Sequence, residues 1–518
     1  MDEKIKIENK IWSRYQAGDN YLINKGVTTN MTKFWNFYND NQWEGLETGG
    51  EEMPFFNFIK PSIKYKVNTI CQNNVTVRFS DINEEDNPIY GILNKGFETL
   101  WRKNSVNIKT WQAVKQAGIE GDGFLFFGTG DMNDAQILSG PMILFGDEQN
   151  SSIQDQPYIM IRTRISVKEA RQLAKENNQN GDSIKGDERP LYMVGNKDNI
   201  EQNDDEAMCT AVIYMQKIDG IVYHAMQVEG VKLKPLQPLA QTIDGEAQKE
   251  GVRLYPIAHM SWEEKPNSAR GMGDVEGMIP NQINLNANLA RIVIATKQCA
   301  FPKLAVNIHA VNNPEDLDRI GGVLELNGSA NSVQQMASFL PGQAQSGDSF
   351  NLNDMLMNYT RTLAGASDSA LGQIDPTRVS GEAVNAISNQ ASMSLNEYVA
   401  KRTQFIEDIA RIYMDITVAF STEGIAYTKD GKEVTIKPEE LTKLKYEIDI
   451  DIAPKYNWSA EDQQRWADNI YNNGNGPVEF EEYTKYLTPD NGIVPKAQIK
   501  EMFQQRNLAQ PEEEEVAE

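Results

Sequence analysis

Apolar and polar residues alternate most regularly between residues 379 and 421 of this 518-residue chain. Apolar side chains recur there every three or four positions, the spacing of one face of an α-helix. This stripe consists of Val384, Ile387, Ala391, Leu395, Tyr398, Phe405, Ile409, Ile412, Ile416 and Ala419. Arg402 takes one expected apolar position and marks a kink, a contact between subunits or an error in the register. The pattern predicts one helix of about 42 residues, roughly 60 Å long, with Ser380 as its N-cap.

The same spacing predicts several shorter helices in the rest of the chain. Most of residues 1–50 have helical character, and further helices are expected at 61–74, 88–101, 108–119, 167–177, 275–299 and 349–364. Ser166 is placed to cap the helix at 167–177, since a serine oxygen can accept from a free backbone N–H of the first turn. Short helices are also expected within 458–508.

Strands are expected where short apolar runs or alternating residues lie between turn residues. These strands are predicted at 121–127, 142–145, 158–161, 210–215, 221–225, 256–262, 304–308, 323–326, 424–428, 432–436 and 445–452. Lys429-Asp430-Gly431-Lys432 is a good hairpin turn. Residues 178–208 are polar and form a loop or an insertion. This irregular mixture of helices and strands predicts an α+β fold.

Composition narrows the class of protein. Apolar residues make up 40% and charged residues 24%, as in folded globular proteins. No apolar stretch is long enough for a membrane span, and the N-terminus lacks the apolar core of a secretory signal. Three scattered cysteines suit a reducing compartment. The net charge of −24 argues against tight phosphate binding, although an acidic surface also simply keeps a protein soluble.

Motifs for catalysis or cofactor binding are weak. Gly271-Met272-Gly273-Asp274 resembles a phosphate-binding loop only loosely, and a turn that begins a helix explains it better. His224, His259 and His309 are too far apart in sequence for a typical zinc motif. No P-loop and no serine nucleophile motif is present. We therefore expect no enzyme, no cofactor and no metal, and an acidic enzyme stays a distant alternative.

The order of parts from residue 271 onward is more specific. A helix, a small β-rich segment, a second helix, a Gly/Pro loop and a very long helix follow one another, and Ser380-Gly381-Glu382-Ala383 opens the last helix. Further supporting segments are 41–45, 121–127, 271–282 and 370–373. This order is similar to that of the portal proteins of tailed bacteriophages. The resemblance covers roughly residues 30–510, and a non-viral ring or scaffold protein is the alternative.

The resemblance implies a phage-portal fold with a mixed α/β wing, a two-helix stem, a small β-rich clip, a long wing helix and a helical crown. By position, these parts would be the wing at 1–270 and 423–457, the stem helices at 271–299 and 348–364, the clip at 300–347, the tunnel loop at 365–379, the long wing helix at 380–422, the crown at 458–510 and a disordered acidic tail at 511–518.

The resemblance also implies function and partners. The chain would form a homo-oligomeric ring, usually a dodecamer, at one vertex of the virion capsid. The ring would be the channel for DNA packaging and ejection, with double-stranded DNA passing without sequence preference, and it would be assembled in the bacterial host cytoplasm. The implied protein partners are terminase, the major capsid protein, a scaffold protein and head-completion or adaptor proteins. No membrane is involved.

Two groups of residues are candidates for facing the DNA. The tunnel-loop candidates are Ser369, Gln373, Asp375 and Arg378, and the stem candidates are Asn281, Asn284, Asn288 and Arg291. Residues 275–364 contain five basic and seven acidic residues, so this stretch is weakly charged. A wall with many arginines would hold phosphates, whereas a weakly polar wall would let DNA slide. An ordinary solvated helix surface explains the same pattern.

Overall fold

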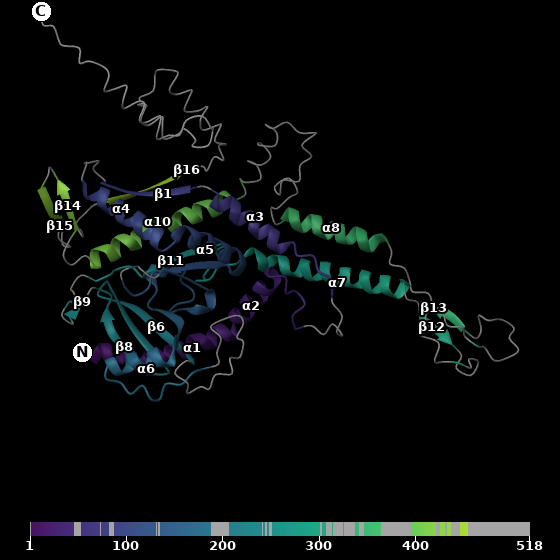
Figure 1. Ribbon diagram of the computed structural model, residues 1–518, viewed down its shortest axis with the longest axis horizontal. Helices are drawn as coiled ribbons and strands as arrows, with labels where there is room; N and C mark the ends of the chain where they lie inside the picture. The colour runs from purple at the N-terminus through teal and green to yellow at the C-terminus, as the bar shows by residue number, and fades with distance from the viewer. Residues whose placement is uncertain are drawn as a thin grey trace, which may run out of the picture. The chain divides into compact units, whose positions relative to one another are not determined.

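The computed structural model describes residues 2–45, 53–72, 74–81, 88–130, 132, 135–187, 207–240, 242–243, 246–247, 251–300, 303–306, 313, 325, 337–340, 347–363, 393, 395–420, 425–429, 432–436 and 446–453. The chain divides into two compact units, Met1–Ile452 and Ala453–Glu518, and the described residues lie almost wholly in the first. Helices and antiparallel sheets are mixed along this unit (Figure 1), which confirms the α+β class.

A five-stranded antiparallel sheet lies between two helices. Its strands, in spatial order, are β4 (Ile143–Phe145), β5 (Ile159–Ser166), β6 (Met208–Ile218), β7 (Ile221–Val228) and β8 (Val231–Pro238). Side chains alternate between the faces of a strand. Val212 and Tyr214 of β6 accordingly pack with α1 (Asp2–Asn24), whereas Cys209 and Ala211 pack with α6 (Val167–Glu176).

Polar contacts fix α1 on this sheet and cap the start of α6. The Glu8 carboxylate of α1 accepts from Lys232 Nζ at 2.8 Å and from the Leu236 backbone N–H at 2.7 Å. The Ser166 hydroxyl caps α6 by accepting from the Glu169 N–H at 3.2 Å, as its sequence position predicts.

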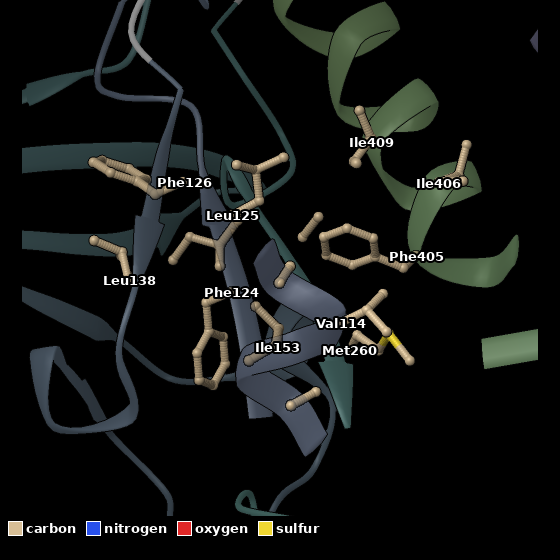
Figure 2. Close-up of a cluster of buried hydrophobic side chains, with 14 of the residues drawn as sticks. Val114, Phe124, Leu125, Phe126, Leu138, Ile153, Met260, Phe405, Ile406 and Ile409 are labelled. Carbon is tan, nitrogen blue, oxygen red and sulfur yellow. The ribbon is translucent and has the colours of Figure 1, made fainter. Parts of the chain in front are cut away.

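The main hydrophobic core joins helices to a second, three-stranded sheet. The sheet consists of β11 (Ile257–Ser261), β2 (Asp122–Phe126) and β3 (Gln136–Leu138). The helices around it are α2 (Val27–Tyr38), α3 (Ile59–Cys71), α4 (Pro88–Lys103), α5 (Val106–Glu120) and α10 (Asn396–Phe420). Figure 2 shows the Phe405 ring of α10 directed toward α5 and these strands, and Ile406 and Ile409 belong to the same buried cluster.

Two further helices, α7 (Asp274–Ala300) and α8 (Gly347–Leu363), lie side by side (Figure 1). Between them in sequence, β12 (Lys303–Val306) and β13 (Ala337–Leu340) pair antiparallel. The remaining paired strands are β1 (Asn74–Asp81) with β16 (Tyr446–Ala453), β9 (Thr242–Ile243) with β10 (Glu246–Ala247), and β14 (Ile425–Lys429) with β15 (Lys432–Ile436); two 3₁₀ turns are η1 (Gly140–Met142) and η2 (Ile153–Asp155). The predicted hairpin is confirmed, because Lys429 pairs with Lys432.

Two sequence predictions are wrong. The long helix is not continuous from 380 to 422: Leu395 lies in a turn and α10 begins at Asn396. The Leu395 carbonyl accepts from the Val399 N–H at 3.0 Å, so this residue, which belongs to the apolar stripe, caps the start of α10. The strand expected at 323–326 is also absent at Glu325, whose N–H donates to the Asn313 side chain at 2.7 Å. β12 pairs with β13, a strand that the sequence analysis does not predict.

Arg402 interrupts the apolar stripe of α10 without leaving the core. Its side chain is only 3% exposed, and its Nη1 donates to the carbonyl of Ile70 at 3.1 Å. Ile70 lies in the last turn of α3, where free carbonyls and the helix dipole favour a cation. Burial lowers the pKa of Arg402. The register of the stripe is therefore correct here, and the arginine joins α10 to α3.

Candidate functional site

The first turn of α7 is fixed by backbone that packs against backbone. Gly121 has a φ of 106°, and a Cβ on it would lie 2.6 Å from the Gly271 carbonyl oxygen. A Cβ on Gly273 would lie 2.7 Å from the Ile119 carbonyl oxygen. The Gly271 N–H donates to the Asp122 carboxylate at 2.9 Å. This close packing leaves no space for a phosphate, so the glycine motif serves the start of α7.

Buried polar side chains then anchor the first half of α7. Lys66 of α3 forms a 2.6 Å ion pair with Asp274, with side chains 9% and 12% exposed. Eight residues further along α7, Gln282 continues this role: its amide donates to the Phe56 carbonyl at 2.6 Å and accepts from the Phe58 N–H at 3.2 Å. The helix therefore leaves the body of the protein in a fixed direction.

A buried carboxylate that the sequence analysis does not single out connects α5 to α2 nearby. Glu120 accepts from Trp35 Nε1 at 2.6 Å, from the Ser139 hydroxyl at 2.8 Å and from the Gly140 N–H at 3.0 Å. Burial raises the pKa of Glu120, and these donors oppose the rise. Sequence spacing alone carries no signal for this cluster, because its members come from three distant segments.

The stem candidates on α7 do not form one free surface. Asn284 and Arg291 are exposed, and Asn281 is partly buried. Asn288 is buried and its Nδ2 donates to Asn353 Oδ1 of α8 at 2.8 Å. Asn288 is therefore a contact between the two helices, which corrects the expectation that it faces a channel. The tunnel-loop candidates Ser369, Gln373, Asp375 and Arg378 lie outside the described residues.

Two apolar surfaces are exposed on the α7 and α8 pair. The first, the α8 stripe, consists of Leu352, Met355 and Tyr359, which are 43%, 50% and 63% exposed. The second, the α7 groove, is a hollow of about 750 Å³ between α2, residues 41–44 and the first half of α7. Its lining includes Thr28, Thr32, Phe37, Trp43, Ile283 and Ala287.

The described residues offer little for chemistry. They hold no cluster of His, Cys, Asp or Glu suited to a metal ion. His259 bonds to Asp122 at 2.9 Å, and burial lowers the pKa of His224 to about 4, which keeps it neutral. His309 lies outside the described part of the chain. A search of the described helices for one long and apolar enough to cross a membrane finds none.

Comparison with known families decides the identity of the chain. The family model for the phage SU10 portal protein matches residues 147–467, well over half of the chain. The chain belongs to this portal protein family. The match runs from the loop after β4 through α7, α8, α10 and β16. It therefore includes the whole α8 stripe and the α7 side of the groove. The other side of the groove, on α2 and residues 41–44, lies before the matched segment. Portal proteins are structural proteins.

Other comparisons add less. No curated protein matches the sequence. Among solved structures, a chain from the neck of an empty GTA particle computed with C6 symmetry is 11% identical with a TM-score of 0.38, covering 85% of this chain and 91% of that chain. A chain from the virion of a native gene transfer agent (GTA) particle is 12% identical with a TM-score of 0.35, covering 84% and 89%. Because both TM-scores are below 0.5, the assignment of this portal protein to its family rests on the sequence match alone.

Proposed function

We propose that this portal protein forms a ring at one vertex of a phage capsid and is the channel through which genome DNA enters and leaves. The observation that carries the proposal is the family match over residues 147–467. The ring would be part of the virion, formed by many copies of this chain, with twelve as the expected number. Terminase, the major capsid protein, a scaffold protein and head-completion proteins are the expected partners.

The surface chemistry of the helix pair supports a sliding role for the channel. Exposed Asn284 is uncharged, and exposed Arg291 on the same side of α7 is a single cation. Between 275 and 364 acidic residues slightly outnumber basic ones, seven to five. Each phosphate held by a cation adds to affinity and slows release. A channel wall of this composition would contact DNA without retaining it.

The parts of the portal are proposed by position in the chain. The wing would comprise 1–270 and 423–457, the stem α7 and α8, the clip 300–347 with β12 and β13, the tunnel loop 365–379 and the crown 458–510. Within the stem, Asn281, Asn284 and Arg291 keep their proposed place on the channel side. The anchoring of α7 through Asp274 and Gln282 supports a stem of fixed direction.

The proposal is tested by removing the chain from the virus. Phage produced without it should yield capsids that contain no packaged genome, as measured by nuclease-protected DNA. Supplying the wild-type chain from a plasmid should restore packaging. Normal amounts of protected DNA in the absence of the chain would contradict the proposed channel role.

A finer prediction concerns the tunnel loop. The double variant Asp375→Ala and Arg378→Ala should reduce the amount of packaged or retained DNA, because the proposed loop position brings these charges to the DNA. A matched control, Asp430→Ala with Lys432→Ala, removes one acid and one base at the β14–β15 turn and should package normally. Wild-type packaging and retention by the loop variant would refute the role of these two residues.

A further inference from the structure

We propose that the α7 groove of one copy binds the α8 stripe of the next copy, so that subunits join head to tail through these two surfaces. This inference rests on the proposed ring and names the contact that builds it. It concerns Leu352, Met355 and Tyr359 on one side and the hollow between α2 and Ile283 on the other.

The two surfaces lie on opposite sides of the helix pair. On α7, Asn288 faces α8, whereas Ile283 of the groove lies about 140° around the helix axis from it, at about 100° per residue. On α8, Asn353 faces α7, and the stripe lies roughly 130° around the axis from that residue. One copy therefore presents its stripe and its groove in different directions.

Two surfaces that face different directions favour a repeating series of subunits over a two-fold symmetric dimer. When a surface binds a different surface on its neighbour, the same step can repeat, and it closes into a ring if the rotation allows. A two-fold contact would instead need one surface that binds itself. The α7 and α8 pair, with a convex stripe and a concave groove, fits the repeating case.

Shape and chemistry of the surfaces match. The stripe has the spacing i, i+3 and i+7, which is how an amphipathic helix places anchors in an apolar groove. A hollow of about 750 Å³ has room for several large side chains. Asp354 is the single charged residue in 351–359, and the groove carries one cation and one anion, Lys33 and Glu44. Contact between the stripe and the groove would therefore bury few charged side chains and bring few like charges together.

A mixing experiment tests this contact directly. Two full-length variants are made, Leu352→Glu with Tyr359→Glu on the stripe and Ile283→Glu with Thr29→Glu in the groove, which Thr29 of α2 also lines. All four positions are exposed, so both variants should fold, which circular dichroism checks. Each alone should be monomeric by light scattering at concentrations where the wild type forms rings. The mixture should form one-to-one dimers, because the intact groove of the first can bind the intact stripe of the second.

Other outcomes would overturn the inference. If the stripe variant still forms rings, the stripe is not part of the contact between subunits. If the mixture stays monomeric, the two surfaces do not bind each other. If only the stripe variant loses assembly, the stripe binds itself. The control Ile108→Glu changes an exposed apolar residue of α5 outside both surfaces and should assemble as the wild type does. A wild type that never forms rings would refute the proposed ring itself, which is a separate result.

Discussion

Replacing Asp274 by alanine is expected to lower the free energy of unfolding by about 3–5 kcal/mol. The change would leave the Lys66 ammonium charged, nearly buried and without its partner 2.6 Å away. It would also remove an acid from the first turn of α7, where the helix dipole favours negative charge. Urea denaturation followed by circular dichroism would measure the shift of the midpoint.

A matched control lies two residues further along the same helix turn. Glu276 pairs with Lys265 at 3.4 Å, and both side chains are more than two-fifths exposed. Exposed pairs of this kind contribute about 1 kcal/mol or less. Glu276→Ala should therefore have a small effect. Equal losses from the two alanine variants would show that the burial of the Lys66–Asp274 pair is not what stabilises the base of α7.

Phe405→Ala is expected to have a similarly large effect, about 3–5 kcal/mol, because it empties a fully buried aromatic site. The ring lies between α10 and the side chains of Val114 and Met260 (Figure 2), so its loss loosens the helix from the three-stranded sheet. Thermal unfolding of the full chain would measure the change. The neighbour Gln404 is exposed, and Gln404→Ala should shift the melting temperature little. A Phe405→Ala protein as stable as the wild type would contradict this account of the core.

Local signals in the sequence predict many elements well. The apolar spacing that predicts a helix at 275–299 corresponds to α7, Asp274–Ala300, and the turn at Asp430-Gly431 lies between β14 and β15. These elements depend on neighbours in sequence, through helix periodicity and turn chemistry. The glycines at 271 and 273 are understood as the start of a helix for the same reason.

The rest depends on contacts between distant segments. β1 pairs with β16, and no local pattern reveals that partner. Asparagines at helical spacing on α7 predict one polar face, but α8 covers Asn288 and residues 56–58 cover Asn286. A helical wheel cannot say which face a neighbour will cover. Arg402 is a charged residue at an expected apolar position of the stripe, and its side chain is buried. Its burial is possible because the Ile70 carbonyl at the end of α3 accepts a hydrogen bond from it.

Electron microscopy of the purified full-length chain tests the central claim most directly. The proposed function predicts closed rings of identical subunits around a central opening wide enough for duplex DNA. A compact monomer that forms no ring at any protein concentration would contradict it.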